Sequence, residues 1–292
     1  MAAPGQVVTL FAHGLPPSAG GRFRSGQAGS LPLPDNLAGI SVEILQNNQT
    51  LRARLLAVRQ ENECQDGGGG GDVCLLTSIR VQIPFELMAD PTYADAGKFT
   101  YAPQVQIRIV VDGQAGRSFA LQPVPDNAHG VTSCDASWDT STKSVCNRYV
   151  YHADGRLADE NAPAKGGEIV VMYFYGLGRT TSEVPSGVAS PPDAPLTEVM
   201  GHPRFMVSFQ KDYVNALSSL PRMLMDFPAR DAELTLAAFA GLTPGQVGLY
   251  QLNIRLPAVT SVYPCGSNAH SNAILNIWTL QGVESTSLCV QP

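Results

Sequence analysis

The sequence predicts an all-β protein: two tandem immunoglobulin-like antiparallel β-sandwich domains joined by a disulfide-stapled connector. Three observations predict this fold class, namely the composition, the alternation of apolar and polar residues, and an internal repeat. Only 15% of the 292 residues are charged, whereas 28 are glycine and 22 are proline. This composition suits many short strands joined by tight turns better than helices with charged outer faces.

Alternation of apolar and polar residues is clearest in two segments of the first half. Residues 105–121, "VQIRIVVDGQAGRSFAL", alternate around Asp112-Gly113, a pair typical of a two-residue hairpin turn. Residues 78–85, "SIRVQIPF", place three apolar side chains on one face before Pro84, which cannot continue a hydrogen-bonded ladder. Both segments therefore predict antiparallel strands.

The internal repeat begins with two nearly matching stretches, "GQVVTLFAHGL" at residues 5–15 and "GEIVVMYFYGL" at residues 167–177. Two more landmarks follow in the same order. "QLNIRLPA" at residues 251–258 matches the segment before Pro84, and "AILNIWTLQGVESTSLCV" at residues 273–290 matches the hairpin. A tandem repeat of one β domain follows, in which each copy opens with an edge strand and then a turn at Gly14 or Gly176.

These landmarks predict one domain over residues 1–122 and another over residues 166–292. The connector between them, residues 123–165, contains "NRYVYHADGRLAD", which reads as a hairpin turning at Asp154-Gly155. In the second copy, "MYFYG" carries aromatic residues on both faces of the opening strand. We therefore expect that strand to be covered on both sides, by the first domain or by another subunit.

The six cysteines form three pairs that are local in sequence. We expect disulfides between the members of each pair: Cys64 with Cys74, Cys134 with Cys146, and Cys265 with Cys289. None belongs to a CxxC or CxxCH motif, so zinc ribbons, thioredoxin-type redox sites and c-type haem attachment are not indicated. Disulfides imply an oxidising compartment. "MAAPG" at the start resembles an initiator methionine placed on a mature terminus after signal-peptide cleavage.

Several of these stretches resemble a known family. "GQVVTLFAHGL", "YHADGRLADENAPAKGGEIVVMYFYGLG" and "LTPGQVGLYQLNIRLPA" are similar to an uncharacterised C-terminal domain family of secreted acidobacterial proteins. The resemblance covers most of the chain and implies secretion, tandem immunoglobulin-like domains and a place beside other extracellular modules. It supplies no catalytic residues. The three cysteine pairs and the glycine run at residues 67–71 depart from the family and favour an independent secreted or surface subunit.

Catalytic and ligand-binding motifs are not evident in the sequence. We find no HExxH, no GxSxG elbow and no Gly-Lys-Ser/Thr after the glycine run, and we expect no catalytic residue, no metal site and no cofactor. The net charge of −6 without a basic cluster argues against nucleic acid, and no apolar run is long enough to span a membrane as a helix. The candidate ligand or interface contacts are Trp138, Tyr149 and Tyr151 in the connector.

The function expected from these features is that of a secreted, non-catalytic structural or interaction protein. Its partners would be proteins, including further copies of itself in a surface assembly or filament, because sandwiches present edge strands to which another strand can be added. An alternative is a monomeric module that binds extracellular polysaccharide through Trp138 and the nearby tyrosines. A third, less favoured alternative is a secreted hydrolase.

Overall fold

The structure is a computed structural model. It describes residues 1–62, 75–89, 92–94, 98–100, 105–132, 135, 149–193, 197–200, 204–209, 233–235, 237–258, 262, 264–265, 271–279 and 281–292. Its elements are all strands: within these residues there is no helix, and so none that could cross a membrane. The predicted all-β class is confirmed, and the sheets are antiparallel apart from one two-stranded pair.

The chain forms two compact units, each described here by itself. Unit 1 comprises residues 1–127, 176–200 and 242–249, and unit 2 comprises residues 128–175, 201–241 and 250–292. The strands of unit 1 are β1 (Val7–His13), β2 (Ser25–Gln27), β3 (Ile40–Gln46), β4 (Gln49–Arg52), β5 (Arg54–Asn62), β6 (Leu75–Gln82), β7 (Thr92–Ala94), β8 (Lys98–Thr100), β9 (Val105–Val111), β10 (Gln114–Ala115) and β11 (Phe119–Leu121).

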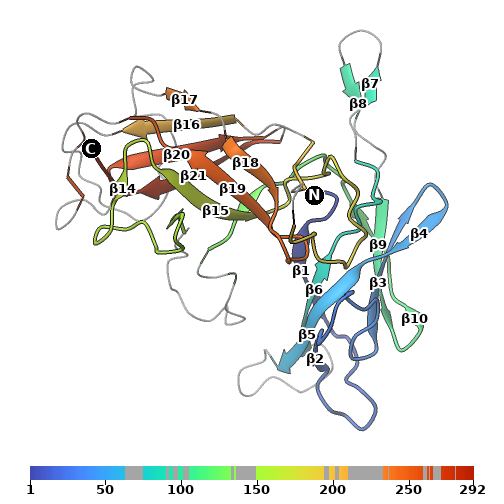
Figure 1. Cartoon of the computed structure of the whole chain (residues 1–292). Helices are drawn as coiled ribbons and strands as arrows, with labels where there is room; N and C mark the ends of the chain where they lie inside the picture. Colours follow the sequence, from blue (N-terminus) through green and yellow to red (C-terminus); the bar gives the residue numbers. More distant parts are fainter. Residues whose placement is uncertain are drawn as a thin grey trace. The chain divides into compact units, whose positions relative to one another are not determined.

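Unit 1 is a β-sandwich. One sheet has the strand order β1-β6-β5-β2 and the other has the order β10-β9-β3-β4 (Figure 1). Strand β11 also pairs with β9. Alternate side chains of both sheets meet in one hydrophobic core, because successive residues of a strand point to opposite faces. The fully buried members include Ile44 on β3, Leu55 on β5, Ile79 on β6 and Ile107 on β9.

Unit 2 contains the remaining strands: β12 (His129–Gly130), β13 (Tyr151–His152), β14 (Ala164–Lys165), β15 (Ile169–Tyr175), β16 (Arg204–Phe209), β17 (Glu233–Thr235), β18 (Ala237–Leu242), β19 (Tyr250–Arg255), β20 (Ala273–Trp278), β21 (Val283–Leu288) and β22 (Val290–Gln291). They form a sheet β12-β15-β19-β18, to which β13 adds, a sheet β17-β16-β20-β21, and the parallel pair β14-β22. Buried apolar residues again alternate along β19 and occur along β20.

The internal repeat seen in the sequence is also a repeat of strand pairing. The order β1-β6-β5 in unit 1 corresponds to β15-β19-β18 in unit 2, and β10-β9-β3-β4 corresponds to β21-β20-β16-β17. Register is repeated as well, since Val7 lies opposite Gln82 and its counterpart Ile169 lies opposite Arg255. Each unit is therefore built from the same seven strands in the same order.

Turn residues take the conformations that the sequence pattern requires. Gly14 and Gly176, which follow the two opening strands, have φ angles of 73° and 80°, in the left-handed region that favours glycine. A side chain at Gly176 would also collide with the backbone carbonyl oxygen of Asn127. Asp112 and Gly113 both have positive φ, as a type I′ hairpin turn between β9 and β10 demands.

Two segments that follow the second opening strand belong to unit 1. Residues 176–200 and 242–249 are held there by hydrogen bonds rather than by long strands. The backbone N–H of Gly187 donates to the Gln82 side chain at 2.7 Å, and the hydroxyl of Ser186 donates to Glu86 at 2.7 Å. The N–H of Ser190 donates to the carbonyl of Gln246 at 2.9 Å, which joins the two segments to each other.

One predicted disulfide lies within the described residues. Cys265 and Cys289 are bonded, with Cα atoms 5.8 Å apart. The other two predicted pairs, Cys64 with Cys74 and Cys134 with Cys146, lie outside the described residues, as does Trp138. The Cys265–Cys289 bond closes a loop of unit 2 next to β22 and fastens the end of the chain to the body of that unit.

Candidate interaction site at the edge of strand β1

Strand β1 forms one edge of its sheet, and its outer side pairs with none of the described strands. Hydrogen-bonding direction alternates along an antiparallel strand. The N–H of Gly14 donates to Leu75 and the carbonyl of Gln6 accepts from Ile83, so the even-numbered residues bond toward β6. The backbone groups of Thr9 and Phe11 therefore point toward the side on which no described strand lies.

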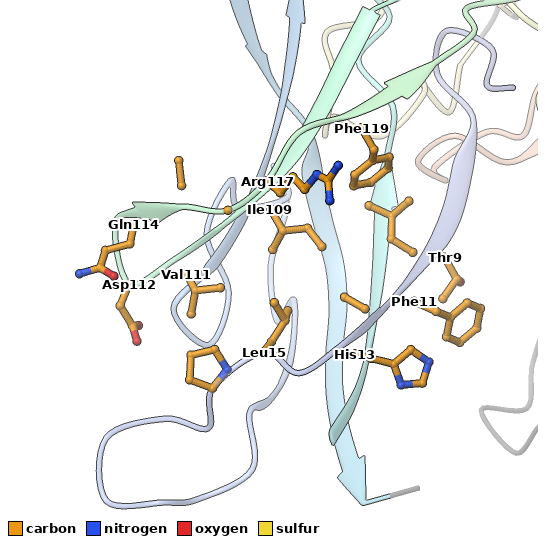
Figure 2. Close-up of a pocket in the computed structure, with 15 residues that line it drawn as sticks. Thr9, Phe11, His13, Leu15, Ile109, Val111, Asp112, Gln114, Arg117 and Phe119 are labelled. Atoms are coloured by element: carbon orange, nitrogen blue, oxygen red, sulfur yellow. The ribbon is translucent and has the colours of Figure 1, made fainter. Parts of the chain in front are cut away.

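A groove of about 890 Å³ runs beside this edge, between β1 and the edge of the opposite sheet. Its apolar lining consists of Leu10, Ala12 and Leu15 from β1 and the following turn, and Ile109, Val111 and Phe119 from β9 and β11. Figure 2 shows Leu15, Ile109 and Val111 on one side of β1, with Thr9, Phe11 and His13 on the other. The side chain of Phe119 is 47% exposed and that of Phe11 is 56% exposed. Apolar surface is thus concentrated beside a strand edge that none of the described strands pairs with.

A buried arginine holds one end of the groove in shape. Arg24 donates from Nε to the carbonyl of Pro16 at 2.8 Å and from Nη2 to that of Pro17 at 3.1 Å. Its Nη1 donates to the carbonyl of Ala38 at 2.8 Å, and the guanidinium binds both carboxylate oxygens of Asp112. The hydrogen bond from Arg24 lowers the pKa of Asp112 below its usual value. One cation therefore joins the turn after β1 to the β9-β10 turn.

The counterpart of this edge in unit 2 is covered. Strand β12 pairs antiparallel with the outer side of β15, placing His129 opposite Tyr175, and β13 pairs there too, placing Tyr151 opposite Val171. The N–H of Val131 donates at 2.9 Å to the carbonyl of Tyr173, the counterpart of Phe11. In consequence Val171 is only 9% exposed, although its counterpart in β1 is an exposed Thr9.

The candidate contact residues Tyr149 and Tyr151 belong to the connector segment that covers the edge of β15. Their rings are 6.0 Å apart, and the ring of Tyr151 meets that of Tyr173 edge to face at 5.9 Å. All three side chains are partly buried. The aromatic residues of "MYFYG" are thus covered in part by the connector of the same unit. Trp138 lies outside the described residues, so the structure does not bring the three candidate residues into one site.

Hydrogen bonds anchor the start of the connector beside β12. The carboxylate of Asp135 accepts from the N–H of Thr132 at 2.6 Å, from its hydroxyl at 2.8 Å, and from Nε2 of His129 at 3.1 Å. Burial opposes ionisation of Asp135, but these donors outweigh it and lower the pKa of Asp135 to about 2. The Asp135 carboxylate is therefore charged, and it accepts hydrogen bonds from other residues of the connector.

Strand β13, which covers part of β15, is anchored by His152, whose two ring nitrogens each have a hydrogen-bond acceptor. Nδ1 of His152 lies 2.5 Å from Oε1 of Glu168, and Nε2 lies 3.0 Å from the carbonyl oxygen of Ala162. Burial alone would lower the pKa of His152, but these acceptors favour the imidazolium and raise the pKa above 6.5. Burial likewise opposes the charge of Glu168, while the Lys165 N–H and His152 lower its pKa below 4.5.

This ion pair predicts a pH dependence of unit 2 stability. The contribution of His152 is complete below pH 6.5, its unfolded value, and is lost as pH rises through the raised pKa of the folded state. The contribution of Glu168 is complete above pH 4.5 and is lost as pH falls through its lowered pKa. We expect His152→Gln to cost about 1 to 2 kcal/mol between these values and less at alkaline pH.

Urea unfolding followed by tryptophan fluorescence measures this, because Trp278 lies on β20 of unit 2. Glu168→Gln is the matched control, since it removes the side-chain partner that raises the pKa of His152 and should reduce the alkaline dependence, while the Ala162 carbonyl remains. A cost of His152→Gln that stays the same from acid to alkaline pH would contradict the assignment.

Comparison with known proteins adds no family. No family model matches this chain, and no curated protein does. Among the described residues there is also no cluster of three or more histidine, cysteine, aspartate or glutamate side chains that could hold a metal ion. The site must therefore be interpreted from its own geometry.

The sequence predicted that both opening strands are edge strands, which agrees with β1 among the described strands but is wrong for β15, because β12 and β13 pair with its outer side. It predicted neither this difference nor the groove. One signal for them was present: the two opening strands match, but the segment that covers β15 occurs before the second copy only. The difference between a covered and an open edge could have been suspected from this asymmetry. The contribution of β9 and β11 to the groove could not, because it depends on how the sheets face each other.

Proposed function

We propose that this protein is a non-catalytic structural or interaction protein of the cell exterior that associates with protein partners, including further copies of itself, in a surface assembly. The observation that carries this proposal is the difference between two equivalent strands. The edge of β15 is covered by β12 and β13, whereas the edge of β1 has no described strand beside it and borders an apolar groove. Unpaired strand edges bind other strands through main-chain hydrogen bonds.

We also infer that the two units are immunoglobulin-like. In that fold, strand B pairs with E and E with D, while C pairs with F, F with G and, in variable-type domains, C with C′. The pairings of unit 1 support this order if β1 is strand B, β3 is C, β4 is C′, β5 is D, β6 is E, β9 is F and β10 is G. On this assignment β12 and β13 take the place of strand A in unit 2.

A location outside the cytoplasm is supported by the Cys265–Cys289 bond, because disulfides persist in oxidising compartments. The resemblance to secreted acidobacterial domains, inferred from sequence motifs alone, agrees with it. In such a setting the low charge content of the chain suits close association between protein surfaces.

Polysaccharide binding is the alternative, and it depends mainly on Trp138. Of the two tyrosines assigned to it, Tyr151 already packs its ring against Tyr149 and Tyr173. Stacking on a sugar needs an exposed ring face, so this packing favours a structural role for Tyr151. Trp138→Ala tested against a panel of glycans would separate the alternatives.

The proposed function is tested first by light scattering on a sizing column, over a wide range of concentration, with the native unreduced protein. Negative-stain imaging of the same fractions shows any regular assembly. We expect species heavier than the 31.0 kDa monomer, in proportions that rise with concentration. A monomer at every concentration would contradict self-association, and the glycan panel would then be the next measurement.

A further inference from the structure

We infer that the open edge of β1 pairs with the same edge of a second copy, antiparallel and about a two-fold axis, to form one continuous sheet across the two molecules. This inference rests on the proposed function and deepens it by naming the surface and the partner. The axis would pass near Leu10, the middle residue of β1. A contact of this kind closes after two copies, so the unit of any larger assembly would be a dimer.

The sequence of β1 lacks the features that usually protect an edge strand. Such edges are blunted by lysine, proline, a bulge or very short length. The strand "VVTLFAH" has seven residues, with no lysine, proline or glycine and no acidic residue. Its pairing with β6 is regular over all seven positions. Two copies can therefore face each other without bringing like carboxylate or ammonium charges together.

The backbone directions fit this pairing. Thr9 and Phe11, which are both exposed, point their N–H and carbonyl groups outward, because the even-numbered residues bond to β6. Two strands that each present odd-numbered residues can be joined with Thr9 opposite Phe11 of the second copy. Unit 2 already contains the same kind of bond, since the carbonyl of Tyr173, the counterpart of Phe11, accepts from Val131.

The side chains of β1 would also fill the groove. Residues on the inner face of a strand added beside β1 point to the same side as Leu10 and Ala12. With a second copy in that place, its own Leu10 and Ala12 would lie over the groove, close to Val111 and Phe119. On the outer face, Phe11 of each copy would gain the neighbouring strand as cover, as Tyr151 covers part of Tyr173 in unit 2.

Stoichiometry favours a second copy over the connector as the strand that covers β1. Within the described residues, each chain has two equivalent opening strands but one covering segment, and that segment lies on β15. Transfer of this segment to β1 of another molecule would expose β15 and leave the number of open edges unchanged. Two-fold pairing of β1 leaves no open copy of this edge.

The inference is tested with the full-length chain by sedimentation velocity and light scattering over a concentration series. Thr9→Pro removes an outward N–H while leaving the bonds to β6 intact, and proline is tolerated where the N–H of an edge strand faces solvent. We expect it to raise the dimer dissociation constant at least about tenfold, because the two-fold axis removes each bond twice. Phe11→Lys, which leaves the backbone unchanged, should also prevent pairing.

Two matched controls isolate the edge. Thr9→Val keeps the N–H and the strand preference, and Phe23→Lys removes another exposed phenylalanine of unit 1 that lies outside β1. Both should dimerise like the wild type. Amide exchange gives an independent readout, since Thr9 and Phe11 should become protected as concentration rises, whereas Leu10 and Ala12 should be protected throughout.

The possible outcomes distinguish failure of the β1 pairing from failure of the proposed function. Association of wild type that Thr9→Pro and Phe11→Lys leave unchanged would overturn the β1 pairing and leave the proposed function standing on another surface. A wild type that is monomeric throughout would overturn both the pairing and self-association. Loss of association in the two β1 variants alone supports both.

Discussion

Replacing Arg24 with methionine is expected to lower the free energy of unfolding of unit 1 by about 3 to 5 kcal/mol. The side chain is 1% exposed and donates to three backbone carbonyls besides Asp112. Methionine has similar length but no donor, so the carbonyls of Pro16, Pro17 and Ala38 would lose charge-assisted hydrogen bonds. Asp112 remains largely in water and contributes little to this cost.

The change in Arg24→Met is measured by urea unfolding with circular dichroism for the whole chain and tryptophan fluorescence for unit 2. Only the circular dichroism transition should move. Arg52→Met is the matched control, because Arg52 is 61% exposed and binds a single partner, Asp35, at 2.9 Å. It should change stability little. Equal losses of unfolding free energy in the two variants would show that the burial of Arg24 does not strengthen its hydrogen bonds.

Removing the Cys265–Cys289 bond by a double substitution to alanine is expected to destabilise unit 2 by about 3.5 kcal/mol in the chain-entropy account. The two cysteines are 24 residues apart in sequence, so the bond restricts a sizeable loop of the unfolded chain. Cys289 is also buried at the start of the stretch that pairs β22 with β14. The bond therefore acts on the unfolded ensemble and on the packing of the C-terminal residues.

Substitution is preferable to a reducing agent, which would also act on the other two predicted disulfides. Tryptophan fluorescence should show a transition at lower denaturant, while the unit 1 component of the circular dichroism signal stays in place. Cys265→Ala alone provides the control for leaving a free buried thiol at Cys289. Unchanged unfolding of the double variant would mean that the bond adds nothing to the stability of unit 2.

Much of the local structure could be predicted from the sequence. The alternation in residues 78–85 and 105–121 appears in the structure as β6 and the β9-β10 hairpin, and Asp112-Gly113 forms the expected turn. The two matched stretches became β1 and β15 with left-handed glycines after them. These predictions succeeded because period-two patterning and glycine preferences act between neighbouring residues.

Other features depended on residues that are distant in sequence. Arg24 has no recognisable motif, and its burial follows from three carbonyls and a carboxylate that only the fold brings together. Likewise, residues 176–200 and 242–249 join unit 1 through single hydrogen bonds such as that between Gly187 and Gln82. Isolated polar contacts of this kind leave no periodic trace in a sequence.

By itself, the sequence of this protein determined the all-β class, the repeat, the register landmarks and the local pairing of Cys265 with Cys289, since each rests on short-range patterning or on matching between copies. Only the tertiary structure decided that β15 is covered, whereas β1 has no described strand on its outer side and lies beside a groove. Whether a strand lies at the edge of its sheet, and whether another segment covers that edge, depends on the strand order and on how the two sheets face each other. Strands with nearly identical sequences can therefore lie in either environment.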